Sequence, residues 1–237
     1  DLVMDRVKEP ELMDTFEQAY AYADADFSSS EESLVNGLEK YLKIKKLDLY
    51  SKSLIIDIGC GPGNISEKLS VRWPSVQIIG IDGSKEMLEI ARKRRESIDD
   101  QARKSCLSYK LASLKSISKN SDNYKLNADL VVSNSVLHHV HKPSDFWKGL
   151  KVLSSSSTVH YHRDLKRPDN LEQAILLQET YLPDAPDVLK KDFLASLCAA
   201  FTVNEVRDQL DKLGLNSLKV TENEKYHLEI YGVTSRS

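Results

Sequence analysis

The stretch Asp57-Ile58-Gly59-Cys60-Gly61-Pro62-Gly63 decides the fold of this 237-residue chain. It ends a short apolar run, residues 54–58, that is typical of a strand buried on both faces, and it leads into a predicted helix over residues 62–71. Glycines in such a turn let the backbone pass close to a ligand, and the N-terminus of the following helix favours anionic groups. The pattern therefore predicts a ligand site without identifying the ligand.

The spacing of the glycines argues against a nicotinamide dinucleotide. The dinucleotide fingerprint is G-x-G-x-x-G. Counted from Gly59, its third glycine would be residue 64, which is an asparagine; Gly63 comes one position too early, and Pro62 stands inside the turn.

Strands alternate with helices through most of the chain, which favours right-handed crossovers and a parallel sheet. We therefore expect an α/β fold with a Rossmann-like, doubly wound sheet. The C-terminal part differs, because a capping box at Thr202 and Glu205 begins a helix that ends at Gly214, and two closely joined strands follow that can pair only antiparallel. The predicted strands are residues 54–58, 76–81, 107–111, 128–132, 158–161, 217–220 and 226–233; helices are predicted at 62–71, after Ser84 and at 143–153, and a surface loop at 154–157.

A carboxylate follows the second predicted strand. Asp82 lies 19 residues after Gly63, where it can accept hydrogen bonds from both ribose hydroxyls of a nucleoside lying over the glycine turn. Enzymes that use nicotinamide cofactors share this feature, so it indicates an adenosine-containing ligand only. The alternative is an ordinary turn residue before Gly83.

Three motifs together resemble the class I S-adenosylmethionine-dependent methyltransferases. Residues 57–63 are similar to motif I of that family, Ile81-Asp82-Gly83-Ser84 with Met87-Leu88 to its ribose-binding turn, and residues 129–139 to its fourth-strand motif. The resemblance implies a seven-stranded sheet, mostly parallel with an antiparallel last strand, and S-adenosyl-L-methionine as cofactor, with S-adenosyl-L-homocysteine as product. It spans roughly residues 54 to 165.

The resemblance also implies roles for single residues. The methionine part of the cofactor would lie against Gly59, Gly61 and Asn134, Asp57 would act through the glycine turn, and Asp82 would hold the ribose. Many members have an acidic residue after the third strand, where this chain has Leu111-Ala112, so backbone groups and packing there are expected to hold the adenine. The cofactor-binding residues expected are Asp57, Gly59, Cys60, Gly61, Asp82, Gly83, Met87, Leu111, Ala112 and Asn134. The flanking segments, including Glu9-Pro10-Glu11-Leu12-Met13-Asp14, are similar to a group of bacterial methyltransferase-domain proteins and imply no particular acceptor.

Five of the six histidines fall in two groups that we expect at one crevice. His138, His139 and His141 follow the fourth strand, and His160 and His162 lie on the fifth. In an open parallel sheet, ligands bind beyond the carboxyl ends of the strands. Three interpretations stay open: histidines satisfied by hydrogen bonds, a general base or orienting group, and a metal site. We expect no metal, because no Cys or Glu motif accompanies the histidines, and we assign the assisting role to His139 or His162.

Other polar residues are candidates for binding the methyl acceptor. Arg163 and Arg167 can bind a carboxylate or phosphate, or else form ion pairs with a nearby acid such as Asp164. Tyr22 belongs to a predicted helix that could cover the cofactor or simply pack. The substrate-binding residues expected are Tyr22, His138, Arg163 and Arg167.

Composition narrows the class of protein. A net charge of −3 gives no basic face for nucleic acid, no apolar run approaches the length of about 20 residues that crosses a bilayer, and three cysteines form no disulfide or metal-ligand pattern. We expect a cytoplasmic monomer or homodimer that binds neither nucleic acid nor membrane; the absence of an initiator methionine suggests that native N-terminal residues are missing.

We therefore predict an S-adenosylmethionine-dependent methyltransferase acting on a small-molecule acceptor. The alternatives are a non-catalytic module that binds the cofactor, and an RNA or protein methyltransferase. The predicted domains are an N-terminal helical cap or lid (1–50), the cofactor-binding core (51–168), a helical substrate-side insertion (169–201), and a C-terminal helix with a strand pair that completes the sheet (202–237).

Overall fold

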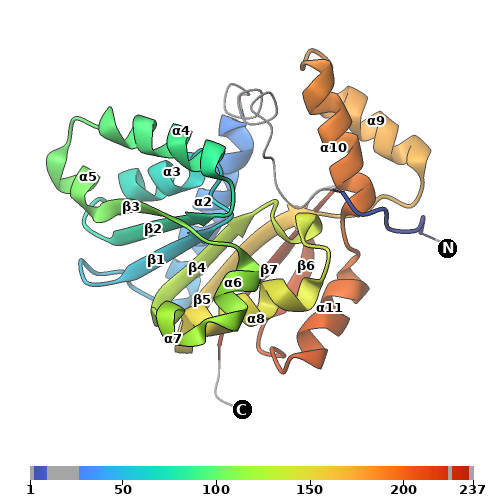
Figure 1. The fold of residues 1–237 in the computed structure, drawn as a ribbon. Coiled ribbons are helices and arrows are strands. Elements are labelled where there is room, and N and C mark those ends of the chain that lie inside the picture. Colours follow the sequence, from blue (N-terminus) through green and yellow to red (C-terminus); the bar gives the residue numbers. More distant parts are fainter. Residues whose placement is uncertain (1–2, 10–26, 224–225, 235–237) are drawn as a thin grey trace.

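The computed structural model describes residues 3–9, 27–223 and 226–234, and these build one seven-stranded sheet with helices on both faces (Figure 1). The strand order is β3-β2-β1-β4-β5-β7-β6. β1 to β5 pair in parallel, whereas β7 is antiparallel to both β5 and β6. The strands are β1 Leu54–Ile58, β2 Gln77–Asp82, β3 Leu107–Leu111, β4 Ala128–Asn134, β5 Ser154–Leu165, β6 Lys219–Asn223 and β7 His227–Val233. The predicted fold class, a mostly parallel Rossmann-like sheet with an antiparallel last strand, is confirmed.

The two faces of the sheet carry separate apolar cores, because the central strands are apolar on both sides. On one face Ile55 and Ile78 pack with helices α2 (Ser28–Lys45) and α3 (Asn64–Arg72). On the other face Ile56 and Val131 pack with helices α6 (Leu114–Lys119), α8 (Pro143–Leu153) and α11 (Val203–Lys212). This sandwich fixes the carboxyl ends of β1, β2, β4 and β5 along one edge of the sheet.

Shorter and peripheral helices complete the structure. Helix α4 packs on β2 and β3, and its predicted N-cap is confirmed, because Ser84 Oγ accepts a hydrogen bond from the Met87 N–H. Both hydrogen bonds of the capping box at Thr202 and Glu205 are present. Figure 1 shows the pair α9 and α10 beyond the ends of the strands, away from the main helical layers. The remaining bounds are α4 Lys85–Glu96, α5 Gln101–Cys106, α7 Ser121–Tyr124, η1 Leu137–His139, α9 Leu171–Tyr181 and α10 Asp187–Ala199.

The structure differs from the prediction at residues 154–157, which were expected to form a loop. They are the first part of β5, and the register with β4 shifts between Ala128 and Leu130. The side chain of Thr158 supports this irregular strand, since its Oγ1 accepts from the Ser155 N–H (2.7 Å) and donates to the Ala128 carbonyl (2.6 Å). Hydrogen bonds to a side-chain hydroxyl thus replace regular backbone pairing in this part of β5. A strand of this kind cannot be predicted from the periodicity of apolar residues.

Within the described ranges, no helix is both long enough and apolar enough to traverse a bilayer.

Candidate active site

The glycine turn after β1 forms the floor of a cleft of about 880 Å³ at the carboxyl edge of the sheet. Gly59, Gly61 and Gly63 have φ values of 64°, 52° and 90°, in the left-handed region that favours glycine. The N–H groups of Gly59 and Cys60 donate to the Ile81 carbonyl at 2.7 and 3.1 Å, so the turn is fixed to the end of β2. A Cβ added at Gly59 would lie 2.5 Å from Val136 Cγ2, so only a glycine backbone fits at this position.

Asp82, at the end of β2, lies in the same cleft. Its Oδ2 accepts from the Gly61 N–H (2.9 Å) and its Oδ1 from the Ser84 N–H (2.7 Å). Burial raises the pKa of Asp82 above its ordinary value, although these backbone donors oppose the shift. Each carboxylate oxygen has two lone pairs, and the backbone donors use one on each. Both oxygens can therefore still accept a hydrogen bond from a ligand hydroxyl.

Asp57 lies beneath the glycine turn and is 1% exposed. Its Oδ2 accepts from Ser66 Oγ at 2.7 Å. Burial raises the pKa of Asp57 to about 7, because removal from water disfavours the charged form more than the Ser66 hydrogen bond favours it. A cation bound above the turn would lower this pKa again.

Most of the predicted cofactor residues line this one cleft. They are Asp57, Gly59, Cys60, Gly61, Asp82, Gly83, Met87, Ala112 and Asn134. Leu111 is not among the described residues that line the cleft, and its side chain is 51% exposed, whereas its neighbour Ala112 lines the cleft.

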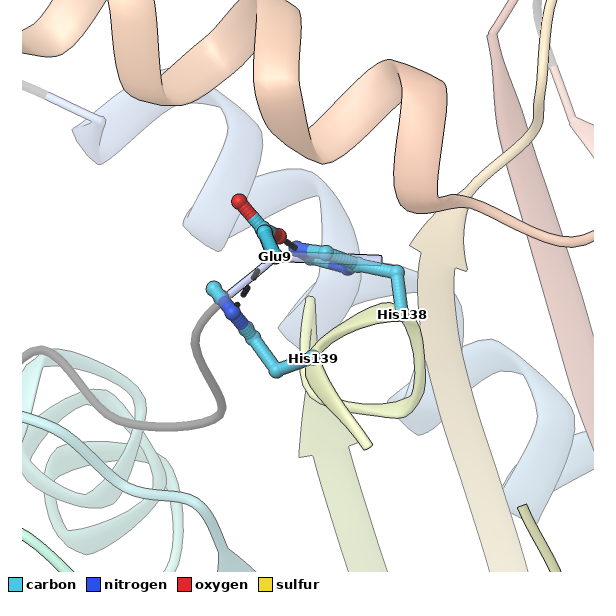
Figure 2. A group of neighbouring side chains, drawn as sticks. All are labelled: Glu9, His138 and His139. Atoms are coloured by element: carbon cyan, nitrogen blue, oxygen red, sulfur yellow. Dashed lines mark ion pairs between the residues drawn. The ribbon is translucent and has the colours of Figure 1, made fainter. Parts of the chain in front are cut away.

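At the other end of the cleft, the turn after β4 carries His138 and His139, and both line the cavity. His138 Nδ1 lies 2.6 Å from Asp164 Oδ1 of β5. Burial opposes a charge on this imidazole, but Asp164 and then Glu9 outweigh it, so the pKa of His138 is raised. Figure 2 shows Glu9, from the N-terminal segment, between the two histidines.

Comparison with known proteins identifies the part of the chain that carries both the glycine turn and the histidine-bearing turn. Residues 56–156 match a family model described as a methyltransferase domain, which spans the glycine turn, Asp82 and the histidine-bearing turn after β4. Residues 56–156 of the chain are a methyltransferase domain.

Several curated relatives of the methyltransferase domain share the name trans-aconitate 2-methyltransferase. Trans-aconitate 2-methyltransferase of Rhodopseudomonas palustris (strain BisB5) is 33% identical over 129 residues, which are 53% of this chain and 43% of the relative. The enzyme of the same name from Afipia carboxidovorans is 62% identical over 40 residues, 17% of this chain and 16% of the relative. The matches thus span less than half the length of these relatives.

Solved structures resemble the whole fold of the methyltransferase domain and its flanks. The plantazolicin methyltransferase BpumL, in complex with a monoazolic desmethylPZN analog and SAH, has a TM-score of 0.69 at 14% identity, with 93% of this chain and 91% of that chain covered. An S-adenosyl-L-methionine-dependent methyltransferase described as putative, from Methanococcus maripaludis, has a TM-score of 0.65 at 18% identity, covering 98% and 99%.

His162, expected to assist transfer, does not reach the cleft of the methyltransferase domain. It is 1% exposed, its Nδ1 lies 2.7 Å from Ser133 Oγ, and its Nε2 lies 3.0 Å from His160 Nδ1. The rings of Phe146 and Trp147 on α8 pack against its imidazole at centroid distances of 5.8 and 6.0 Å. Burial lowers the pKa of His162 well below its ordinary value, so this side chain is a neutral part of the core, as in the hydrogen-bonded alternative.

The two arginines proposed for the acceptor are both engaged by acids. Arg163 lines the cleft, but its Nη2 lies 2.8 Å from Glu229 Oε1 of β7. Arg167 lies outside the described lining of the cleft, because its guanidinium forms a two-bond ion pair with Glu205 (2.8 and 3.0 Å). Arg163 and Arg167 therefore both form ion pairs, as in the alternative interpretation. Their partners, Glu229 and Glu205, were not predicted from the sequence. Tyr22 lies outside the described residues.

Two residues near the histidines escaped the prediction. Glu9 was noted only within a flanking motif, and Arg6 not at all. Arg6 Nε donates to the Ala199 carbonyl (2.6 Å), and its Nη2 donates to the carbonyls of His138 and Val140 (both 3.1 Å). No local sequence pattern reports contacts between segments so distant along the chain.

Proposed function

We propose that this chain transfers the methyl group of S-adenosylmethionine to a small-molecule acceptor bound in the same cleft. The observation that carries the proposal is the continuity of the cleft: one cavity joins the glycine turn and Asp82 to the turn with His138 and His139. A nucleoside cofactor and an acceptor could therefore meet without a change of fold.

The cofactor half of the proposal assigns each end of the ligand. The ribose hydroxyls would donate to Asp82, and the adenine would lie between Gly83, Met87 and Ala112. The amino acid part would lie against Gly59, Gly61 and Asn134, with Cys60 in the turn. Asp57, held by Ser66, would supply negative charge beneath the cationic end of the ligand.

The acceptor half would be covered by helices α9 and α10, which belong to the predicted insertion at residues 169–201. Leu189, Phe193 and Ser196 of α10 line the cleft, as do Tyr181 and Leu182 at the end of α9. This mixture of apolar and hydroxyl groups suits a compact, partly apolar molecule. The relatives' name refers to trans-aconitate, but the matched share of each chain is too small to assign that acceptor here.

When bound, S-adenosylmethionine supplies an activated methyl group on a sulfonium, and transfer is an in-line displacement. The chain would then have to align the acceptor and exclude water. Of the two histidines predicted to assist, His139 is the one that lies in the cleft, and its Nδ1 is 3.2 Å from Glu9 Oε1. We assign it to the acceptor side as an orienting group.

The test is to supply S-adenosylmethionine labelled in its methyl group together with a fractionated cell extract, and to follow the label. We expect it in a low-mass, dialysable product, and a variant Asp82→Ala should abolish the transfer. Label in protein or RNA fractions would favour the macromolecular alternative. Binding of S-adenosylhomocysteine without transfer to any fraction would favour the non-catalytic module.

A further inference from the structure

Three ligand-type atoms converge beside the cleft. Glu9 Oε1 lies 3.3 Å from His138 Nε2 and 3.2 Å from His139 Nδ1, and all three atoms lie within 4.8 Å of one another. The side chains are 9%, 2% and 18% exposed, so water screens this group little. Figure 2 shows the carboxylate of Glu9 directed between the two imidazoles.

The hydrogen bonds around Asp164 determine the tautomer of His138. They therefore decide whether the nitrogen that faces Glu9 is a donor or an acceptor. The carboxylate of Asp164 accepts from the N–H groups of Leu137 (2.7 Å) and Leu165 (2.8 Å), and it lies 2.6 Å from His138 Nδ1. Because an ionised carboxylate only accepts, Nδ1 carries the proton. In the neutral ring, Nε2 then directs its lone pair toward Glu9.

The contact between His138 and Glu9 lacks hydrogen-bond geometry. Across the described residues, neither His138 Nε2 nor Glu9 Oε1 has a hydrogen-bond partner, although both atoms are fully buried. Two buried acceptor atoms 3.3 Å apart repel each other unless a positive species lies between them. A proton on His138 Nε2 would remove the repulsion between His138 and Glu9 only. A cation bonded to all three atoms would remove it for Glu9, His138 and His139 together.

We propose that Glu9, His138 and His139 bind one divalent metal ion of the zinc type. Zn–N and Zn–O bonds of about 2.0–2.1 Å in tetrahedral geometry separate neighbouring ligand atoms by about 3.3–3.4 Å. The two separations in the structure, 3.3 and 3.2 Å, match that edge length. Two imidazoles and one carboxylate form a set that suits Zn²⁺ and disfavours Mg²⁺, which prefers oxygen ligands.

The surroundings of the three ligands are those of a metal site. Histidine ligands of metals characteristically donate the other ring N–H to a carboxylate, as His138 does to Asp164. The N-terminal segment is held in place by backbone contacts: the Val7 N–H donates to the Cys198 carbonyl (2.9 Å), and His141 Nε2 contacts the Glu9 carbonyl. Glu9 is therefore positioned before any ion binds.

Three protein ligands leave a tetrahedral ion one further position, and both histidines line the cleft. In a step that rests on the proposed function, this position would take a hydroxyl or carboxylate oxygen of the methyl acceptor. Metal binding by the chain alone does not depend on that step.

The test is calorimetric titration of the full chain, without an affinity tag and after dialysis against a chelator, with zinc chloride. We expect one ion per chain and no heat from magnesium chloride. Glu9→Gln should weaken zinc binding at least about 100-fold, and Asp164→Asn, which only supports the ligand His138, about 10–100-fold. His227→Gln is the matched control, because His227 lines the same cleft outside the three ligands and should leave zinc binding unchanged.

Cobalt(II) provides a second measurement, since a tetrahedral site with nitrogen ligands gives visible absorption bands that Glu9→Gln should abolish. Absence of stoichiometric zinc binding, or binding that Glu9→Gln leaves intact, would overturn the proposal. S-adenosylhomocysteine is titrated in parallel with the same metal-free protein. If it binds while zinc does not, the metal site alone is wrong.

Discussion

The carboxylate of Asp82 joins Gly61 to Ser84: one oxygen accepts from the N–H of Gly61 at 2.9 Å, and the other from the N–H of Ser84 at 2.7 Å. The first contact fixes the glycine turn and the second fixes the residue that caps α4. One side chain therefore sets the spacing between the two backbone segments that would face the cofactor.

Replacing this carboxylate should weaken cofactor binding while the fold is kept. Asp82→Asn removes the charge that strengthens hydrogen bonds from ribose hydroxyls, so we expect affinity for S-adenosylhomocysteine to fall about 10–100-fold. Asp129→Asn is the matched control, because Asp129 Oδ2 also accepts from a backbone N–H, that of Leu54 (2.8 Å), at the opposite edge of the sheet. Calorimetry measures both variants. An equal loss in the two would contradict the assignment of the ribose.

A side chain at Gly59 should destabilise the protein more than one at Gly214. Both glycines have left-handed φ values, 64° and 67°, so the conformational cost of alanine is about 1–2 kcal/mol at each. Only at Gly59 would the new Cβ collide with a neighbour, Val136, which adds about 1–3 kcal/mol. Urea unfolding of Gly59→Ala and Gly214→Ala measures the difference, and Val136→Ala in the Gly59→Ala background should recover part of it. Equal unfolding midpoints would show that the close approach is not limiting.

The buried carboxyl of Asp57 should make the ligand-free protein lose stability as the pH rises from about 4 to 7. The folded-state pKa is about 7, above the ordinary 3.8, so the native state binds more protons than the unfolded state in this window. Stability therefore falls with rising pH, by up to about 4 kcal/mol from this group. Asp57→Asn removes this contribution, so the free energy of unfolding of the variant minus that of the wild type should increase between pH 5 and pH 8. A difference that is flat or falls over this range would exclude the buried proton.

Arg167 should contribute to stability and not to the cleft. Its guanidinium is bound by Glu205 and by the carbonyls of Met4 and Ala200 (both 2.8 Å). Because the side chain of Glu205 is 38% exposed, solvent moderates the ion pair, and we expect Arg167→Gln to cost about 2–3 kcal/mol rather than the full value for a buried pair.

The control for Arg167 is Arg207, an exposed arginine whose Nη2 donates to the Val220 carbonyl (3.3 Å). Arg207→Gln should cost at most about 0.5 kcal/mol. Urea unfolding and calorimetry with S-adenosylhomocysteine report stability and cofactor binding separately. If Arg167→Gln lost affinity for the cofactor at unchanged stability, Arg167 would have to be assigned to the binding cleft.

The sequence predicted the elements whose signals are local. Strands β1 and β3 and helix α8 have the predicted bounds: β1 is an apolar run that ends at the glycine turn, and α8 begins at Pro143. His160 and His162, two residues apart on β5, lie on the same side of the strand. That this side is covered by α8 depends on packing between distant segments, so the sequence could not exclude His162 from the cleft.

The acceptor side shows the same limit more strongly. Glu9 meets His138 and His139 only because the chain passes back over the ends of β4 and β5, and nothing near residue 9 encodes that path. The cofactor side was easier to predict, since the glycine turn, the carboxylate at Asp82 and Ala112 each follow a strand within a few residues, and adjacent parallel strands bring them to one edge.

The guanidinium of Arg6 links the two walls of the acceptor side of the cleft, helix α10 and the turn with the histidines. It holds the end of α10 through Ala199 and the histidine turn through His138 and Val140. A molecule that displaces the Arg6 guanidinium would leave three carbonyls without this donor at once. Helix α10 and the turn with the histidines would then separate together. Hydrogen exchange at the amides of Val7 and Leu137 should then proceed at one shared opening rate, whereas unrelated rates would mean that the two walls move independently.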